Sequence, residues 1–206
     1  MKNKKEQTTL SRKNQWAFVA KSYLALAYIG LQELKNKKYF NREKISILRL
    51  GQWQVYDAQL LLIPVIWNFK HAIELVLKAH DVTFQGKYSK THNVKSLKDE
   101  LAKTLDINEK DENFDEFAKT IDKYYQLKFF GGKLLTSSQI FDIDNDVFRY
   151  PESSKPTFQL DLKTFQKITK KEFDELEKDI DLIYRRLAIP AEYKHLKKHW
   201  EEWAHS

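Results

Sequence analysis

The side chains with the clearest potential for chemistry are Lys78, His92 and Arg149, which are cationic or can become so. A guanidinium binds a phosphate through a rigid fork of N–H donors, and an imidazole can move a proton near neutral pH. Tyr150 directly follows Arg149, so a ring that can stack on a base stands beside a group that can hold a phosphate. Together these residues predict a cleft for an anion such as a nucleotide or RNA.

Each of these side chains also has a purely structural interpretation. Arg149 could pair with Glu74 or with an aspartate of residues 142–146. Lys78 follows Glu74 by four residues, in the order that favours an intrahelical ion pair. His92 stands at an expected helix start, where free N–H groups favour an anion, but a histidine there can also cap the helix or pack locally. Glu74 matters most, because a carboxylate that neutralises Lys78 or Arg149 would close the anion site.

The elements that must position these residues are helices. Before Gly86, apolar residues recur at steps of three and four, which predicts a long amphipathic helix. Its apolar stripe consists of Ile66, Phe69, Ile73, Val76 and Leu77. His71, Glu74 and Lys78 fall on the opposite, polar face. A loop around Gly86 then leads to a second helix, expected from about Asn93 to Leu105.

Similar periodicity predicts helices over about residues 14–36, 113–129 and 162–188, and a short C-terminal helix over 192–203. The apolar face expected for the first of them consists of Trp16, Val19, Tyr23, Leu26, Ala27 and Leu31.

The connections between the helices are less regular. The helix before Gly86 is expected to begin near Gln54 or at Pro64. The connector before it could hold a helical turn over residues 45–50, and residues 157–162 alternate like a strand.

These elements predict an all-α fold, an antiparallel helical bundle with helical appendages. We expect a flexible basic tail over residues 1–13, the helical domain over 14–190 and a C-terminal helix over 191–206. Residues 60–67 are apolar on all sides, which is typical of a segment that lies in the core or is covered by a partner subunit. We therefore expect a homodimer.

Composition limits the class of protein. The chain has 206 residues, a net charge of +7 and no cysteine, which excludes disulfides and thiolate chemistry and fits a cytoplasmic location. Its basic clusters could attract phosphates or could simply be solvated. The longest apolar run is too short to span a membrane, so we expect no membrane association. His195 and His199 lie one helical turn apart without a third ligand, so we predict no metal site and no cofactor.

One stretch resembles a known family. The sequence AIELVLKAH at residues 72–80, followed by a loop and THNVKSL at residues 91–97, resembles the HEPN domain family, the higher eukaryotes and prokaryotes nucleotide-binding domain. The resemblance implies an antiparallel helical bundle, a homodimer and a role in RNA or nucleotide binding. It also implies a setting such as a prokaryotic defence or toxin–antitoxin system.

The resemblance departs from the catalytic members at one motif. HEPN ribonucleases carry an arginine followed four to six residues later by a histidine, and Arg149 lies in the region where that arginine is expected. No histidine follows Arg149 within that window. We therefore expect a binding protein that is not a standard HEPN nuclease. The alternatives are a divergent, metal-independent ribonuclease toxin that uses Arg149 and His92, and a pure protein-interaction module.

Overall fold

The computed structural model describes residues 2–36, 48–50, 53–55, 61–86, 89–104, 112–132 and 168–187. Its α-helices are α1 (Lys2–Lys35), α3 (Leu62–Gln85), α4 (Val94–Thr104), α5 (Glu112–Tyr125) and α7 (Lys170–Arg186). A short 3-10 helix, η2, covers Phe129–Gly132. Two short strands, β1 (Leu48–Leu50) and β2 (Trp53–Val55), pair antiparallel.

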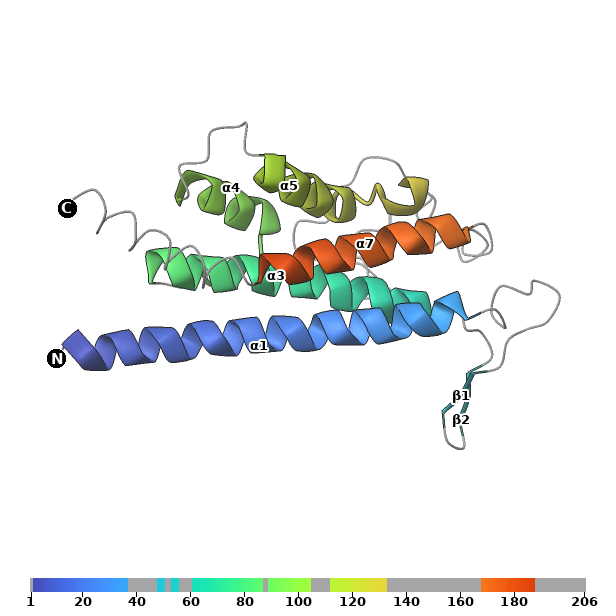
Figure 1. Cartoon of the computed structure of the whole chain (residues 1–206), viewed down its shortest axis with the longest axis horizontal. Helices are drawn as coiled ribbons and strands as arrows, with labels where there is room; N and C mark the ends of the chain where they lie inside the picture. The colour runs from blue at the N-terminus through green and yellow to red at the C-terminus, as the bar shows by residue number, and fades with distance from the viewer. Residues whose placement is uncertain are drawn as a thin grey trace, which may run out of the picture.

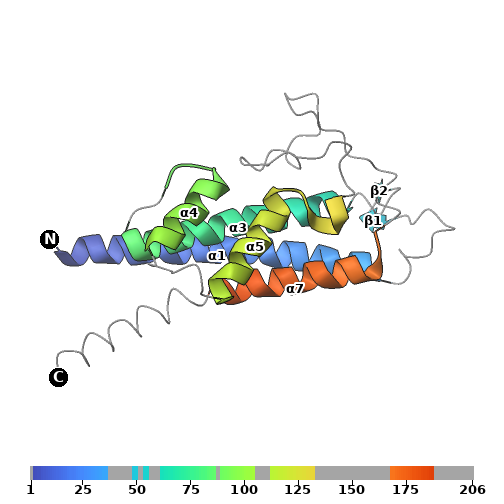
Figure 2. The same cartoon turned by 90° about the horizontal axis from the view of Figure 1, so that it is seen from above.

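The helices form a bundle around α3. In both views α1 and α3 lie side by side and run in opposite directions (Figures 1 and 2). α7 packs against α1 and α3, while α4 and α5 pack on α3 from the side away from α1 (Figure 1). The predicted all-α antiparallel bundle is therefore confirmed.

The contact between α1 and α3 is close because small residues line it. Ala20, Ala27 and Gly30 of α1 are spaced at three and seven residues, and both alanines are fully buried. A Cβ atom added at Gly30 would lie 2.6 Å from Cγ2 of Val65. α1 thus covers the first turns of α3 on one side. In the apolar segment at residues 60–67, Leu62, Val65 and Ile66 are buried in the core, whereas Leu61, Ile63 and Trp67 are partly buried and Pro64 is exposed.

α1 also differs from its prediction. It begins at Lys2 rather than Asn14, so it includes most of the stretch that we expected to be a flexible tail. Val19 and Leu26, which we placed on the buried face, are 39% and 54% exposed. The apolar residues of α1 lie on two faces, which a periodicity count on sequence alone merges into one.

The other helix ends follow local backbone chemistry. Gly86 closes α3 in the left-handed region with φ 69°, and its N–H donates to the carbonyl of Val82. α5 ends at Tyr125, short of the expected Phe129, because Leu127 takes a positive φ of 56° that an α-helix does not allow. Thr169 begins α7 with a capping box to Glu172.

Two expectations for the connections can be compared with the structure. α3 begins at Leu62, between the two starts that we considered. The expected helical turn over residues 45–50 is wrong at its end, because Leu48–Leu50 is a strand. Apolar and polar residues alternate there and across residues 53–55, which is the period of a strand. The expected strand at 157–162 and C-terminal helix lie outside the described residues.

Within the described part, no helix combines the length and apolar character needed to cross a membrane.

Candidate functional site

The candidate site is built around the carboxylate of Glu74, at the middle of α3. Nζ of Lys78, one turn further along the helix, lies 2.8 Å from Oε1 of Glu74, which confirms the predicted intrahelical pair. Both residues are buried, with exposed fractions of 2% for Glu74 and 4% for Lys78. The polar face of α3 that the sequence predicts is therefore covered. α1 lies over it, and Nζ of Lys78 is 5.6 Å from the ring centroid of Trp16.

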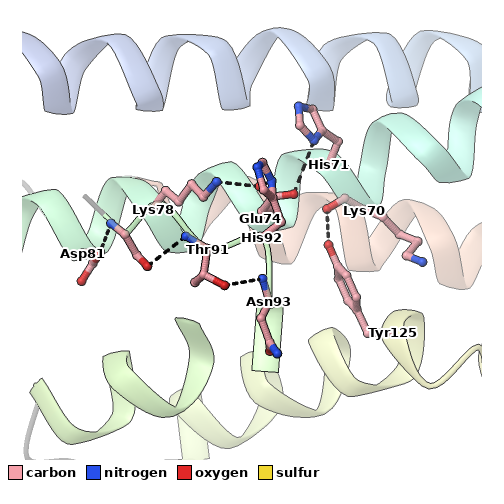
Figure 3. Close-up of polar contacts among 10 residues, drawn as sticks. Lys70, His71, Glu74, Lys78, Asp81, Thr91, His92, Asn93 and Tyr125 are labelled. Carbon is pink, nitrogen blue, oxygen red and sulfur yellow. Dashed lines mark hydrogen bonds and ion pairs between the residues drawn. The ribbon is translucent and has the colours of Figure 1, made fainter. Parts of the chain in front are cut away.

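His92 reaches the same carboxylate from the segment before α4 (Figure 3). Its Nδ1 lies 2.8 Å from Oε1 of Glu74, although the two residues are 18 positions apart in the chain. The side chain of Glu74 is 3% exposed, whereas that of His92 is 59% exposed. A buried carboxylate thus holds one nitrogen of an imidazole that is open to solvent.

The segment that carries His92 is fixed by a chain of hydrogen bonds. The backbone N–H of Ser89 donates to Oδ2 of Asp81 at 2.8 Å, and that of Thr91 donates to Oγ of Ser89 at 3.3 Å. The N–H of Asn93 donates to Oγ1 of Thr91 at 3.0 Å (Figure 3). These bonds anchor the segment to α3 at one end and lead directly into α4 at the other, which holds His92 over Glu74.

Asn93 caps the helix that follows the site. Its Oδ1 accepts a hydrogen bond from the backbone N–H of Ser96 at 2.9 Å, as expected for an N-cap residue. His92 therefore stands immediately before the N-terminus of α4, as predicted, but it is held by Glu74 rather than by the helix.

A third side chain approaches Glu74 from an aromatic cluster. Nδ1 of His71 lies 3.7 Å from Oε2 of Glu74, which is longer than a hydrogen bond but within ion-pair distance. The ring of His71 stacks on Trp67, with centroids 5.3 Å apart, and meets the edge of Tyr23 at 4.6 Å. Nε1 of Trp67 is buried and has no hydrogen-bond partner in the described part of the chain.

The surroundings of Glu74 keep its carboxylate ionised. Burial raises its pKa, but the contact with His71, the hydrogen bond and charge of Lys78, and the hydrogen bond from His92 together outweigh burial and lower the pKa to about 2. An ionised carboxylate can only accept hydrogen bonds, so Nδ1 of His92 carries the proton in their contact. When the imidazole of His92 is neutral, its Nε2 is therefore the nitrogen that can accept a hydrogen bond or a proton from a ligand.

The predicted site residues divide into two groups. Glu74, Lys78 and His92 come together, and Lys78 is neutralised by Glu74 as we considered from their spacing. Lys78 therefore faces a carboxylate and not an open cleft. Arg149 and Tyr150 lie outside the described residues, so their place in the site stays a prediction.

Sequence reasoning missed His71 and the anchoring role of Asp81. His71 precedes Glu74 by three residues, a helical spacing that brings side chains together and could have identified it. The bond from Ser89 to Asp81 depends on the path of a loop, and no spacing rule predicts it.

Comparison of the chain with models of protein families, with curated proteins and with solved structures gives no match. The function is therefore inferred from this geometry and from the residues themselves.

Proposed function

We propose that this protein binds a phosphate-containing ligand, RNA or a nucleotide, at the surface around His92. The observation that carries the proposal is the pair formed by Glu74 and His92, in which a buried, ionised carboxylate orients an exposed imidazole. An imidazole fixed in this way loses little conformational freedom when a ligand binds, which favours affinity. Glu74 is a positioning residue, and His92 is the residue that meets the ligand.

The charges near His92 are compatible with an anionic ligand. Lys90 and Lys95 flank it in the sequence and are both exposed. α4 begins two residues after His92, and the N-terminus of a helix attracts negative charge. Lys78 contributes to the site indirectly, because its charge holds Glu74 in the ionised form.

The resemblance to HEPN domains adds residues and a setting to this proposal. It gives Arg149 the role of a second phosphate contact, and the ring of Tyr150, next to Arg149 in the sequence, would stack on a base. It also places the protein, as a homodimer, in a prokaryotic defence or toxin–antitoxin system. The missing histidine after Arg149 favours ligand binding over the cleavage chemistry of standard HEPN nucleases.

The test is a titration of the full chain with fluorescently labelled single-stranded RNA and, separately, with labelled ATP, at low and at physiological salt. We expect His92→Ala to weaken binding by about tenfold, the equivalent of one charge-assisted hydrogen bond. Binding that involves phosphates should also weaken as salt rises. Lys119→Ala is the matched control, because Lys119 is an exposed cation on α5.

The outcome that contradicts the proposal is equally specific. His92 is exposed, so His92→Ala should leave the fold intact, and circular dichroism checks this. If RNA and ATP both fail to bind the wild type, or bind it and the folded His92→Ala variant equally well, the surface around His92 is not the ligand site.

A metal-independent ribonuclease is the second candidate, and the same pair of residues favours it. A carboxylate that fixes the tautomer of an imidazole is suited to general-base catalysis. Here Nε2 of His92 would accept the proton of a ribose 2′-hydroxyl. Turnover of labelled RNA in the presence of a chelator, lost in His92→Ala and kept in Lys119→Ala, would establish this candidate. Salt-sensitive binding without turnover would favour the binding protein.

A further inference from the structure

One face of α1 is apolar and open to solvent. Over residues 18–29 the strongly exposed large side chains are Phe18 at 71%, Leu26 at 54% and Ile29 at 64%. Val19 and Tyr28 are exposed at their edges, at 39% and 44%. We call this surface the outer face of α1. It lies opposite the row of Ala20, Leu24, Ala27 and Leu31 that packs into the core.

We infer that the outer face of α1 is the contact surface for a second copy of this chain, packed antiparallel across a two-fold axis between Ser22 and Ala25. This inference is independent of the ligand site at His92. Bulky residues stand at the two ends of the face and small ones, Ser22 and Ala25, at its middle. The steps from Phe18 to Ser22, Ala25 and Ile29 are four, three and four residues, and they read the same in both directions.

A two-fold contact needs a surface that is complementary to itself. Reversal about the midpoint brings Phe18 opposite Ile29 of the second copy. A helix turns by about 100° per residue, so Val19 and Leu26 share one edge of the face, and Val19 meets Leu26 of the second copy there. Ser22 and Ala25 meet at the centre, where small side chains let two helices approach closely. Each apolar or small side chain of these three pairs thus meets another of its kind.

Charge also favours a second copy as the occupant. Lys21 is the only charged residue between Phe18 and Ile29. Lys21 and Tyr28 share the other edge of the face, so the reversal brings Lys21 near Tyr28 of the second copy. The two lysines therefore do not face each other, and their carbon chains can cover apolar surface. A nucleic acid would need several cations here, and a basic or acidic protein would need charges of opposite sign. Nζ of Lys21 also lies 6.0 Å from the ring centroid of Tyr184 on α7, which is 52% exposed and extends the surface.

The contact lies elsewhere than the sequence indicated. The sequence left residues 60–67 either in the core or covered by a partner subunit, and Leu62, Val65 and Ile66 are buried in the core of their own chain. The outer face of α1 is the apolar surface that this packing leaves uncovered among the described helices.

Light scattering on the full chain over a series of micromolar concentrations is the first test. We expect a dimer that Leu26→Glu weakens by more than about tenfold, because each copy would then place a carboxylate against the apolar Val19 of the other. Gln85→Glu adds the same charge at an exposed position of α3, where the side chain contacts Thr104 of α4, and should leave the dimer unchanged. A wild type that stays monomeric, or a dimer that Leu26→Glu leaves intact, would overturn the inference. Circular dichroism checks that both variants fold.

Cross-linking tests the antiparallel geometry directly, because the chain has no cysteine of its own. Two Ser22→Cys copies would have their substituted positions offset by about 4–5 Å along the helices, since a helix rises about 1.5 Å per residue. Two Phe18→Cys copies would be offset by about 16 Å by the same rise. A disulfide needs Cα atoms within about 7 Å, so mild oxidation should link Ser22→Cys and not Phe18→Cys. Equal linking of both variants indicates parallel packing, and linking of neither indicates a different surface; either result refutes the proposed contact.

Discussion

Replacing Glu74 by glutamine should make the free energy of unfolding of this protein less dependent on pH. The carboxylate of Glu74 is 3% exposed and lies 2.8 Å from both Lys78 and His92. Its pKa falls from an ordinary 4.5 to about 2 in the folded chain. A group whose pKa is lowered by folding stabilises the folded state above its unfolded pKa, and this contribution disappears as the pH falls towards its folded pKa.

The magnitude follows from the size of that shift. One unit of pKa corresponds to about 1.4 kcal/mol, so a fall from 4.5 to about 2 contributes about 3 kcal/mol to the free energy of unfolding at neutral pH. Loss of the charge also leaves Lys78, at 4% exposure, buried without a counter-charge. Breaking one partner of a buried ion pair typically costs about 3–5 kcal/mol, and the hydrogen bonding that glutamine retains places the expected loss near the lower limit.

Urea denaturation followed by circular dichroism, at a series of pH values from neutral down to about 2, measures the difference between wild type and Glu74→Gln. We expect a difference of about 3 kcal/mol above pH 5 that shrinks through the interval from 4.5 to 2. Asp174 and Glu177, whose pKa values are lowered by their bonds to Lys35, titrate in both proteins and cancel in the difference. A difference that does not change with pH, or no difference at neutral pH, would refute the electrostatic account of Glu74.

Two further predictions concern the packing that positions the site. Gly30→Ala should destabilise the fold by about 1–3 kcal/mol in a thermal melt, because its Cβ would lie 2.6 Å from Val65; adding Val65→Ala should recover part of this loss, and a Gly30→Ala variant as stable as wild type would show that α1 can move away. Thr169→Ala should cost about 1 kcal/mol, because it removes the acceptor of the capping box with Glu172 at the start of α7; Thr169→Ser keeps that acceptor and is the control, and equal losses in both variants would contradict the capping explanation.

The helices could be predicted from the sequence because their apolar residues repeat at the helical period. The positions of α3, α4, α5 and α7 follow from that signal, and Gly86 marks the end of α3 as expected. Periodicity describes one helix at a time, so it does not say whether another element covers the polar side. That is why the sequence places Glu74 and Lys78 on the polar face of the helix without indicating that α1 and the segment before α4 bury them.

The candidate site was predictable only in part, for the same physical reason. The pair formed by Glu74 and Lys78 is local, and its four-residue spacing identifies it. The contact between Glu74 and His92 depends on how the segment from Ser89 to Asn93 lies along α3, which is fixed by the bond from Ser89 to Asp81. Loop paths of this kind depend on tertiary contacts, so the sequence placed His92 at a helix start without indicating its partner.

The burial of charge on α3 bears on whether Glu74 serves structure or function. A buried ion pair is seldom more stable than two apolar side chains of similar size, so stability alone gives little reason for Glu74 and Lys78 in the interior. A doubly substituted chain, Glu74→Met with Lys78→Met, removes both charges together and should be more stable than Glu74→Gln. It also leaves His92 without the carboxylate that orients it. If Glu74 is a positioning residue, this double variant should fold well and still bind RNA as weakly as His92→Ala; recovery of binding together with stability would show that Glu74 and Lys78 only support the fold.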